Sequence, residues 1–244
     1  MDLWYIRLIV VLYVCFALTE EVVKANEYPR TKFWKLRGAV STLCYLTVAV
    51  YAPLFWDEWL AEKSLLDLTA LPFWASLPIA FLSFELCQYV WHRTMHTFSP
   101  IWRMFHQMHH SAESFDVHGA FYFSLADMIG FTFLASFSLV FLIGVPANVA
   151  IWAGLLHSFL SIFQHANLKT PRWLGFLVHR PENHALHHAR GVHSFNYGNT
   201  PLFDFIFGTF RNPDSFPQEV GFYEGASLKI LDMHLAKDVS KSGK

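Results

Sequence analysis

Eight histidines fall into three clusters whose spacing is typical of metal ligands. The clusters are His92-x3-His96, His106-x2-His109-His110 and His184-x2-His187-His188. In an α-helix, residues three and four positions apart share one face, so each cluster directs its imidazoles toward a common point. Neutral imidazole suits iron, zinc or copper, whereas magnesium and calcium prefer the carboxylates that these clusters lack. The ligands are too many for one tetrahedral zinc ion and are enough for two metal ions.

The composition indicates a membrane protein. Hydrophobic residues make up 54% and charged residues only 15% of the 244 positions, well below the roughly 25% of charged residues in soluble domains. The near-zero net charge and the lack of a lysine or arginine run argue against nucleic acid as a partner. All the cysteines (Cys15, Cys44 and Cys87) lie in apolar segments, which predicts neither a disulfide framework nor a cysteine metal site.

Hydropathy predicts five spans and places the three clusters on one side of the membrane. The spans are residues 3–18, 38–56, 70–91, 119–145 and 146–163. A basic segment between the first two spans predicts a cytoplasmic loop, and an acidic loop after the second span predicts the opposite side. Regions 92–118 and 164–244, which carry the metal-site residues, are then both cytoplasmic. A cleavable signal peptide at the start is the competing interpretation, which Asp2 and the absence of a basic leading region disfavour.

We therefore expect an all-α integral membrane protein with four to five transmembrane helices and a cytoplasmic helical cap that carries a histidine-rich dimetal site. Residues 1–244 show no internal repeat and no low-complexity linker, so a single domain is the economical interpretation. The bacterial inner membrane and the endoplasmic reticulum both fit this expectation.

Other polar residues are candidates for an additional ligand or for a hydrogen bond to a ligand imidazole. Glu85 and Gln88 precede His92 by seven and four residues on the same helix face, where a hydrogen bond would fix the imidazole tautomer. The alternative is that Glu85 forms an ion pair with Arg93 or Arg103. Weaker or more ambiguous candidates are His118, His193, Asp116, Asn167 and Asn183.

Two groups of residues are candidates for the route to the metals. His157 lies inside an apolar span, and an ionisable group there usually faces the protein interior. The aromatic residues Phe121, Tyr122 and Phe123 either line an apolar channel or pack in the core. His179 and His234 follow no ligand pattern, so we expect them to be structural.

The cluster pattern resembles the fatty acid hydroxylase and sterol desaturase superfamily of membrane proteins. The resemblance covers about residues 84–212 and, besides the histidines, includes Glu85, Ser111, Asp116-Val117, Phe163-Gln164-His165-Ala166-Asn167-Leu168, Pro181, Asn196-Tyr197-Gly198, Phe203-Asp204 and Phe207-Gly208-Thr209-Phe210. It implies a histidine-bound centre of two iron ions, for which zinc can substitute in a purified protein, and dioxygen as co-substrate. It also implies that His165 is a ninth ligand. A tenth histidine of some members is replaced by Lys169, so water, His118 or His193 remain alternatives.

The resemblance implies an oxidoreductase that hydroxylates or desaturates a C–H bond of a membrane lipid or its acyl chain. A sterol or carotenoid hydroxylase or desaturase of the same superfamily is the nearest alternative. A separate electron donor, either ferredoxin-like or a small haem protein with a reductase, is implied as well. Candidates for its docking surface are Lys169, Arg172, Arg180 and Arg190.

Two rival functions belong to other classes. A membrane metal transporter or sensor needs polar residues through several spans, and the spans offer only Arg7, Glu85, Asp127 and His157. A zinc hydrolase of lipids needs a general base beside its ligands, and the chain lacks the HExxH pairing that provides one. Both rivals are weaker than the oxidoreductase interpretation.

Overall fold

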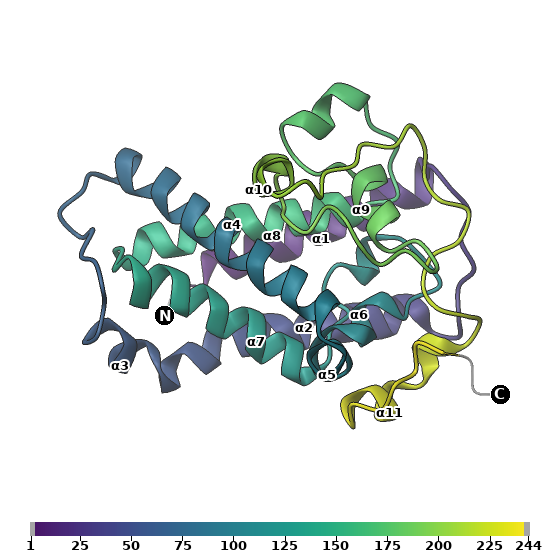
Figure 1. Ribbon diagram of the computed structural model, residues 1–244, viewed down its shortest axis with the longest axis horizontal. Coiled ribbons are helices and arrows are strands. Elements are labelled where there is room, and N and C mark those ends of the chain that lie inside the picture. Colours follow the sequence, from purple (N-terminus) through teal and green to yellow (C-terminus); the bar gives the residue numbers. More distant parts are fainter. Residues whose placement is uncertain (1–2, 242–244) are drawn as a thin grey trace.

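Long helices packed side by side form most of the structure, a computed structural model that describes residues 3–241 (Figure 1). They are α1 (Trp4–Val22), α2 (Trp34–Tyr51), α4 (Phe73–Thr97), α7 (Leu125–Ser136) and α8 (Ala147–His165). A 3-10 turn, η1 (Ala52–Phe55), extends α2, and a π-helical segment, η4 (Phe137–Leu142), continues α7. Helix α8 packs between α4 and α1, and α2 packs against α7.

Short helices and loops form a cap at one end of this bundle, on the right in Figure 1. The cap contains α5 (Ser99–Ile101), the π-helical η2 (Trp102–His106), α6 (Gln107–His110), η3 (Val117–Gly119), η5 (Arg172–Phe176), α9 (Pro181–His187), α10 (Pro201–Ile206), η6 (Ala226–Leu228) and α11 (Ile230–His234). The short α3 (Asp57–Ala61) lies at the opposite end. Within residues 3–241 the regular elements are all helical, so the predicted all-α fold with a helical cap is confirmed.

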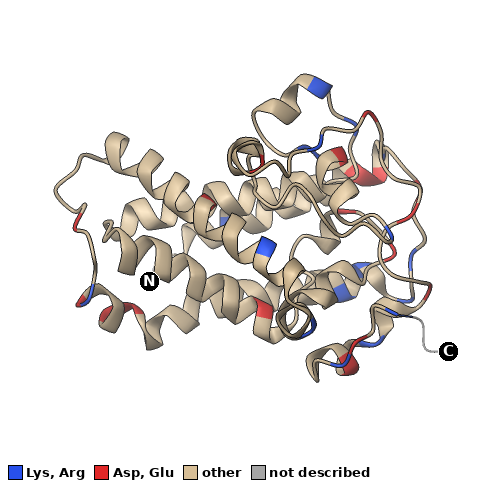
Figure 2. Cartoon of the chain, viewed as in Figure 1, with Lys and Arg blue, Asp and Glu red and all other residues tan. Residues whose placement is uncertain are grey.

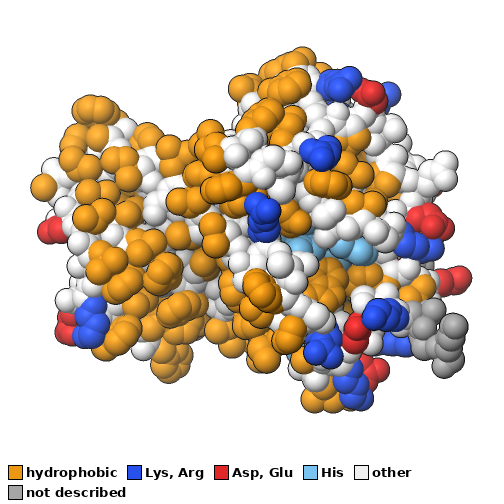
Figure 3. Space-filling view, in the orientation of Figure 1, with side chains coloured by type: hydrophobic (Ala, Val, Ile, Leu, Met, Phe, Trp, Pro, Cys, Tyr) orange, Lys and Arg blue, Asp and Glu red, His pale blue; other side chains and the backbone are white. Residues whose placement is uncertain are grey.

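Four helical segments within the described part of the chain are long and apolar enough to cross a membrane. They are Trp34–Phe55, Phe73–Thr97, Leu125–Leu142 and Ala147–His165. Charged residues gather on the cap and near α3 and are sparse along the bundle (Figure 2), whose visible face is largely hydrophobic (Figure 3). The chain is therefore a multi-pass membrane protein. The predicted span 3–18 forms most of α1, which is not among the four because it also carries Arg7, Glu20 and Glu21.

The end of α4 and the start of α7 determine which residues lie in the cap. Helix α4 is 25 residues long, and because about 20 residues cross the hydrocarbon, its last turns carry His92 and His96 out of it. Helix α7 begins at Leu125, later than the predicted start at residue 119. The Ser124 side chain accepts a hydrogen bond from the Asp127 backbone N–H (3.1 Å), which caps the helix there. The preceding residues 119–124 are consequently free to follow the cap.

A glycine on α2 allows the cap to pack directly against the bundle. A Cβ atom at Gly38 would lie 2.4 Å from the His118 carbonyl oxygen and 2.7 Å from the His118 Cβ atom. Because backbone lies on both sides of this contact, neither side can move away as a flexible side chain would. The close approach holds η3 beside the bundle, next to the second histidine cluster.

We predict that Gly38→Ala lowers the midpoint of thermal unfolding in detergent, because the added methyl group overpacks this contact at a cost of about 1–3 kcal/mol. Gly154→Ala on α8 is the matched control, since nothing lies within 4 Å of a Cβ atom there. Alanine has a higher helix propensity than glycine, so Gly154→Ala is expected to leave the midpoint of thermal unfolding unchanged or slightly raised. Equal midpoints for the two variants would contradict the packing argument.

Candidate metal centre

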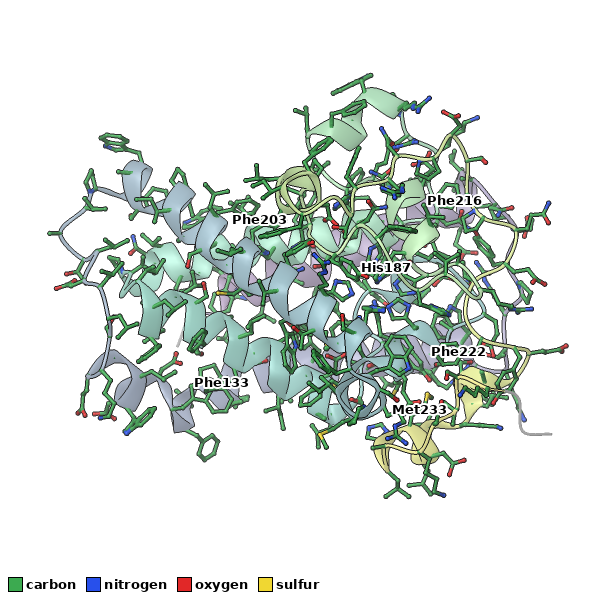
Figure 4. The ribbon with its side chains drawn as sticks, viewed as in Figure 1. Phe133, His187, Phe203, Phe216, Phe222 and Met233 are labelled. Carbon is green, nitrogen blue, oxygen red and sulfur yellow. The ribbon has the colours of Figure 1, made fainter. Side chains whose placement is uncertain are left out.

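Nine imidazoles from distant parts of the chain converge in two groups between the bundle and the cap. The five-histidine group consists of His92, His96, His106, His110 and His187, and the four-histidine group consists of His109, His165, His184 and His188. Within each group the candidate ligand nitrogens lie within 4.8 Å of one another. Figure 4 places His187 beside the cap end of α4. The structure thus brings together all eight cluster histidines and His165.

The two HxxHH clusters contribute to both groups in a reciprocal way. His106 and His110, four residues apart, point into the five-histidine group, whereas His109 points into the other. In the third cluster the pattern is reversed, with His187 alone in the five-histidine group. Adjacent helical residues point about 100° apart, so a histidine pair such as His109-His110 serves two sites at once. The groups touch where the rings of His110 and His188 stack with centroids 4.1 Å apart.

Backbone carbonyl groups fix the protons of several imidazoles. The Nδ1 atoms of His92, His187 and His165 each lie 2.7 Å from a carbonyl oxygen, that of Tyr197, Phe195 and Ser161 respectively. A carbonyl oxygen can only accept a hydrogen bond, so each Nδ1 donates and the Nε2 atom of a neutral ring is left with its lone pair. These lone pairs point into the groups.

The converging lone pairs fit a bound metal ion in each group. The Nε2 atom of His92 lies 3.0 Å from that of His106, and the Nε2 atom of His165 lies 3.1 Å from those of His109 and His184. Ligands at about 2.0–2.1 Å from one ion are separated by roughly 2.9–3.4 Å. The buried Nε2 atoms of His96, His110 and His187 have no hydrogen-bond partner among the described residues. A cation in each group would satisfy these atoms, so the residues present fit two metal ions.

Burial keeps the ligand imidazoles of the cap neutral. Desolvation, and after it the nearby imidazoles, hold the pKa well below the usual histidine value for His106, His109, His110, His184, His187 and His188. Neutral rings are the form that binds a metal ion, so no proton has to be removed near pH 7 before metal binds.

One hydrogen-bond partner of a ligand was not predicted as such from the sequence. Asp127, which is fully buried on α7, accepts a hydrogen bond from His106 Nδ1 (2.9 Å). A carboxylate in this place fixes the ring orientation and raises the basicity of the ligand nitrogen. The available signal was an acidic residue inside an otherwise apolar stretch, which suggested an ion path and not a partner of a histidine.

The predicted hydrogen bond from Glu85 or Gln88 to an imidazole of the two groups is not found. Glu85 Oε1 accepts hydrogen bonds from the backbone N–H groups of Asn199 (2.7 Å) and Thr200 (2.6 Å), and Gln88 lies beside His157 and Asn199. The reason is that the loop at residues 195–200 folds over this face of α4. Glu85 therefore supports the ligands indirectly, since the same loop supplies the carbonyl group that binds His92.

The other candidates lie at varying distances from the two groups. His193 is nearest, with its Nδ1 atom 3.1 Å from that of His110, whereas His118 binds the Tyr13 hydroxyl group (2.7 Å). The other three hold the surrounding chain: Asp116 accepts from Trp34 Nε1, Asn167 pairs with the Asn26 backbone, and Asn183 lies beside His179 and Asn196. His179, expected to be structural, donates to Asp204 (2.9 Å) below the 195–200 loop.

A cavity of about 710 Å³ extends from the histidines into the bundle. His92, His106, His109, His165 and His184 line its cap end, and Leu54 and Asp57 line the end near α3. Between these ends its walls are mostly apolar, and its volume lies in the range of roughly 300–1,000 Å³ that is usual for small-molecule sites. The arrangement can place an apolar chain against the metal centre away from water.

The structure also places four further candidate residues. Phe121 and Phe123 line the cavity, whereas Tyr122 packs against Trp34 and binds the Ser227 carbonyl oxygen (2.9 Å). Arg180, proposed for a docking surface, is only 1% exposed, because it is held by Asn212, Glu182 and the Thr170 carbonyl oxygen. It is therefore not available to a partner.

The fold and the site define a multi-pass membrane protein with a nine-histidine centre at the end of an apolar cavity. Residues 77–209 match the profile of the fatty acid hydroxylase family. The match covers more than half of the chain and includes all nine histidines, so the chain belongs to this family.

A curated relative narrows the comparison. The chain is 27% identical over 179 residues to the ornithine lipid hydroxylase OlsE of Rhizobium tropici. The aligned residues cover 72% of this chain and 50% of that protein. The chain thus spans about half the length of this relative. No solved structure matches the chain.

We predict that Asp127→Asn lowers the affinity for a divalent metal ion by roughly 10- to 100-fold, because the His106 ring loses the carboxylate that orients it. The measurement is a competition titration of the purified protein with a zinc chelator. Asp67→Asn, in an exposed loop away from the histidines, serves as the control. An unchanged affinity in Asp127→Asn would contradict the role of Asp127 in orienting the His106 ring for metal binding.

Proposed function

We propose that the protein is an iron- and dioxygen-dependent oxidoreductase that hydroxylates a C–H bond of a membrane lipid. The observation that carries the proposal is the position of the nine converging imidazoles at one end of an apolar cavity inside a membrane bundle. The family assignment and the ornithine lipid hydroxylase among the relatives support the same reaction and favour hydroxylation over desaturation.

The metal ligands in this proposal are the nine histidines of the two groups, which would hold two iron ions. Two iron ions held there would supply the activation of dioxygen that protein side chains cannot provide. Imidazole nitrogens without carboxylate ligands suit iron, zinc and copper, so zinc can substitute for iron in a purified protein. Overall, R–H, O₂, two electrons and two protons would give R–OH and water.

The protein's own residues orient the substrate and exclude water. Phe121, Phe123 and Leu155 line the cavity with apolar surface, so an acyl chain or other lipid segment would lie against the histidines without competing water. Asp127 and the carbonyl groups around His92, His165 and His187 hold the ligand rings in place during this reaction. These contacts would supply positioning, and metal ions held by the histidines would supply the activation of dioxygen.

We infer that the cap faces the cytoplasm. The basic segment that connects α1 to the first turn of α2 lies at the cap end, where Arg37 in that first turn donates a hydrogen bond to the Ser227 carbonyl oxygen (2.6 Å). Basic residues flanking spans favour the cytoplasmic side. A separate ferredoxin-like or small haem protein would deliver the electrons there, in a bacterial inner membrane or the endoplasmic reticulum.

We predict that cells expressing the protein accumulate a membrane lipid that carries one additional oxygen atom, and that His109→Ala abolishes this product. His109 contributes to the four-histidine group, so its removal opens the shell of one metal ion. The measurement is lipid mass spectrometry of membranes from matched cultures, combined with the iron content of the purified protein.

His234→Ala is the control for this experiment, because His234 lies outside both groups and is exposed near the start of α7. It should retain the oxygenated lipid and the iron. A lipid that instead loses two hydrogen atoms would identify a desaturase. Full product formation by His109→Ala would refute the ligand assignment, and metal transport into vesicles without lipid oxidation would favour the transporter.

A further inference from the structure

One wall of the mostly apolar cavity is polar next to the histidines. His157, Ser161 and Gln164 on α8 line the cavity together with Gln88 on α4. On α8 these residues are four and then three positions apart, so they share a helix face that leads to His165. We call these four residues the polar wall. Neither the metal ligands nor the apolar chain of a lipid requires it.

Asn199 connects all four residues of the polar wall from behind. Its Nδ2 atom lies 2.8 Å from His157 Nδ1 and 3.2 Å from Gln88 Oε1. Its Oδ1 atom lies 3.0 Å from Gln164 Nε2 and 3.4 Å from Ser161 Oγ. Asn199 is completely buried, and its backbone N–H donates to Glu85. The wall is therefore held rigidly by the loop that also holds His92.

The direction of the hydrogen bonds follows from one carbonyl group. His157 Nε2 lies 3.3 Å from the Phe81 carbonyl oxygen, which can only accept, so this nitrogen carries the proton. His157 Nδ1 and Gln88 Oε1, which lie 3.1 Å apart, then both accept hydrogen bonds from Asn199 Nδ2, whose two N–H groups can serve both. It follows that Asn199 Oδ1 faces Gln164 and accepts from its Nε2 atom.

Gln164 Oε1 is the atom of this network that receives no hydrogen bond. It is buried without a hydrogen-bond partner among the described residues, and Gln164 as a whole is only 4% exposed. The side chain lines the cavity, and the next residue in the chain belongs to the four-histidine group. A buried acceptor without a donor is destabilising, so the site is complementary to a ligand that brings an N–H or O–H group.

We propose that Gln164 is a specificity-determining residue that accepts a hydrogen bond from a neutral N–H or O–H group of the lipid substrate. The reacting carbon then lies close in the molecule to an amide or a hydroxyl group, and not in the middle of an unsubstituted acyl chain. A cationic amine is disfavoured because the neighbouring site would hold two metal cations. This inference rests on the proposed function, since it names the substrate class of the same cavity.

Ester-linked acyl chains without a hydroxyl group do not satisfy this acceptor. An ester offers only acceptor oxygens, so placing it beside Gln164 Oε1 leaves that atom unpaired and adds a second acceptor. A site built for a donor rejects an analogue that lacks it more strongly than an apolar pocket rejects an additional methylene group. The polar wall would thereby select among membrane lipids of equal chain length.

The test compares three synthetic lipids with the same headgroup and chain length: an amide, an ester, and an ester with a hydroxyl group near the linkage. Their binding to the purified protein in lipid nanodiscs is measured after loading with zinc, which prevents turnover. We expect at least one donor-bearing lipid to bind roughly 5- to 100-fold more tightly than the plain ester. The arm that gains affinity distinguishes an amide from a hydroxyl donor. Equal binding of all three lipids would overturn the proposal and leave water as the partner of Gln164.

Gln164→Met removes the amide at nearly constant volume and should abolish the preference, so that all three lipids bind alike. Leu155→Met, which changes an apolar wall of the same cavity on the same helix, is the matched control and should keep the preference. Zinc content confirms that both variants retain the metal centre. A preference that survives in Gln164→Met, or one that is lost equally in Leu155→Met, would overturn the assignment.

The same lipids separate this inference from the proposed function. With iron, dioxygen and a chemical or enzymatic reductant present, a preference in binding without any oxygenated lipid would contradict the proposed reaction and leave the subsite standing. Oxygenation of all three lipids with equal affinity would support the reaction and contradict the subsite. Fragmentation mass spectra of the product should place the new oxygen next to the amide or hydroxyl group.

Discussion

The fixed positions of a few imidazole protons are the constraint on which the rest of this structure depends. Carbonyl groups bind Nδ1 of His92, His165 and His187. This leaves the Nε2 lone pairs of His92 and His165 facing those of neighbouring histidines at 3.0–3.1 Å, and the Nε2 atom of His187 buried without a partner among the described residues. Such a cluster is unfavourable by itself and becomes favourable around cations. The irregular 195–200 loop is consequently part of the metal site, and Asp204 holds it by accepting from the backbone N–H groups of Tyr197 (2.9 Å) and Gly198 (3.0 Å).

The reciprocal use of two HxxHH clusters explains how one short cap serves two sites. Each cluster lends a pair of residues four positions apart to one group and its third histidine to the other. Displacing either cluster would therefore disturb both groups. The second cluster begins at His106, the last residue of the π-helical segment η2, and the third begins three residues after Pro181 starts α9. Local helix geometry, and not long side chains, sets the convergence.

Local patterns predicted the parts of the structure that depend on local physics. Hydropathy located the four spans, and imidazole spacing located eight of the nine histidines that converge, whereas His165 required the family resemblance. The partners of the ligands were harder to predict, because Glu85 and Asn199 meet only after a loop from far along the chain folds over α4. Asp127 had a visible signal, an acid in an apolar stretch, but its partner depends on how α7 packs beside η2.

The most direct measurement of the central claim is metal analysis combined with X-ray absorption spectroscopy of the protein purified with its iron. We expect two iron ions per chain, each with a first shell dominated by imidazole nitrogens at roughly 2.0–2.2 Å. One ion per chain, or a first shell dominated by oxygen or sulfur ligands, would contradict the account.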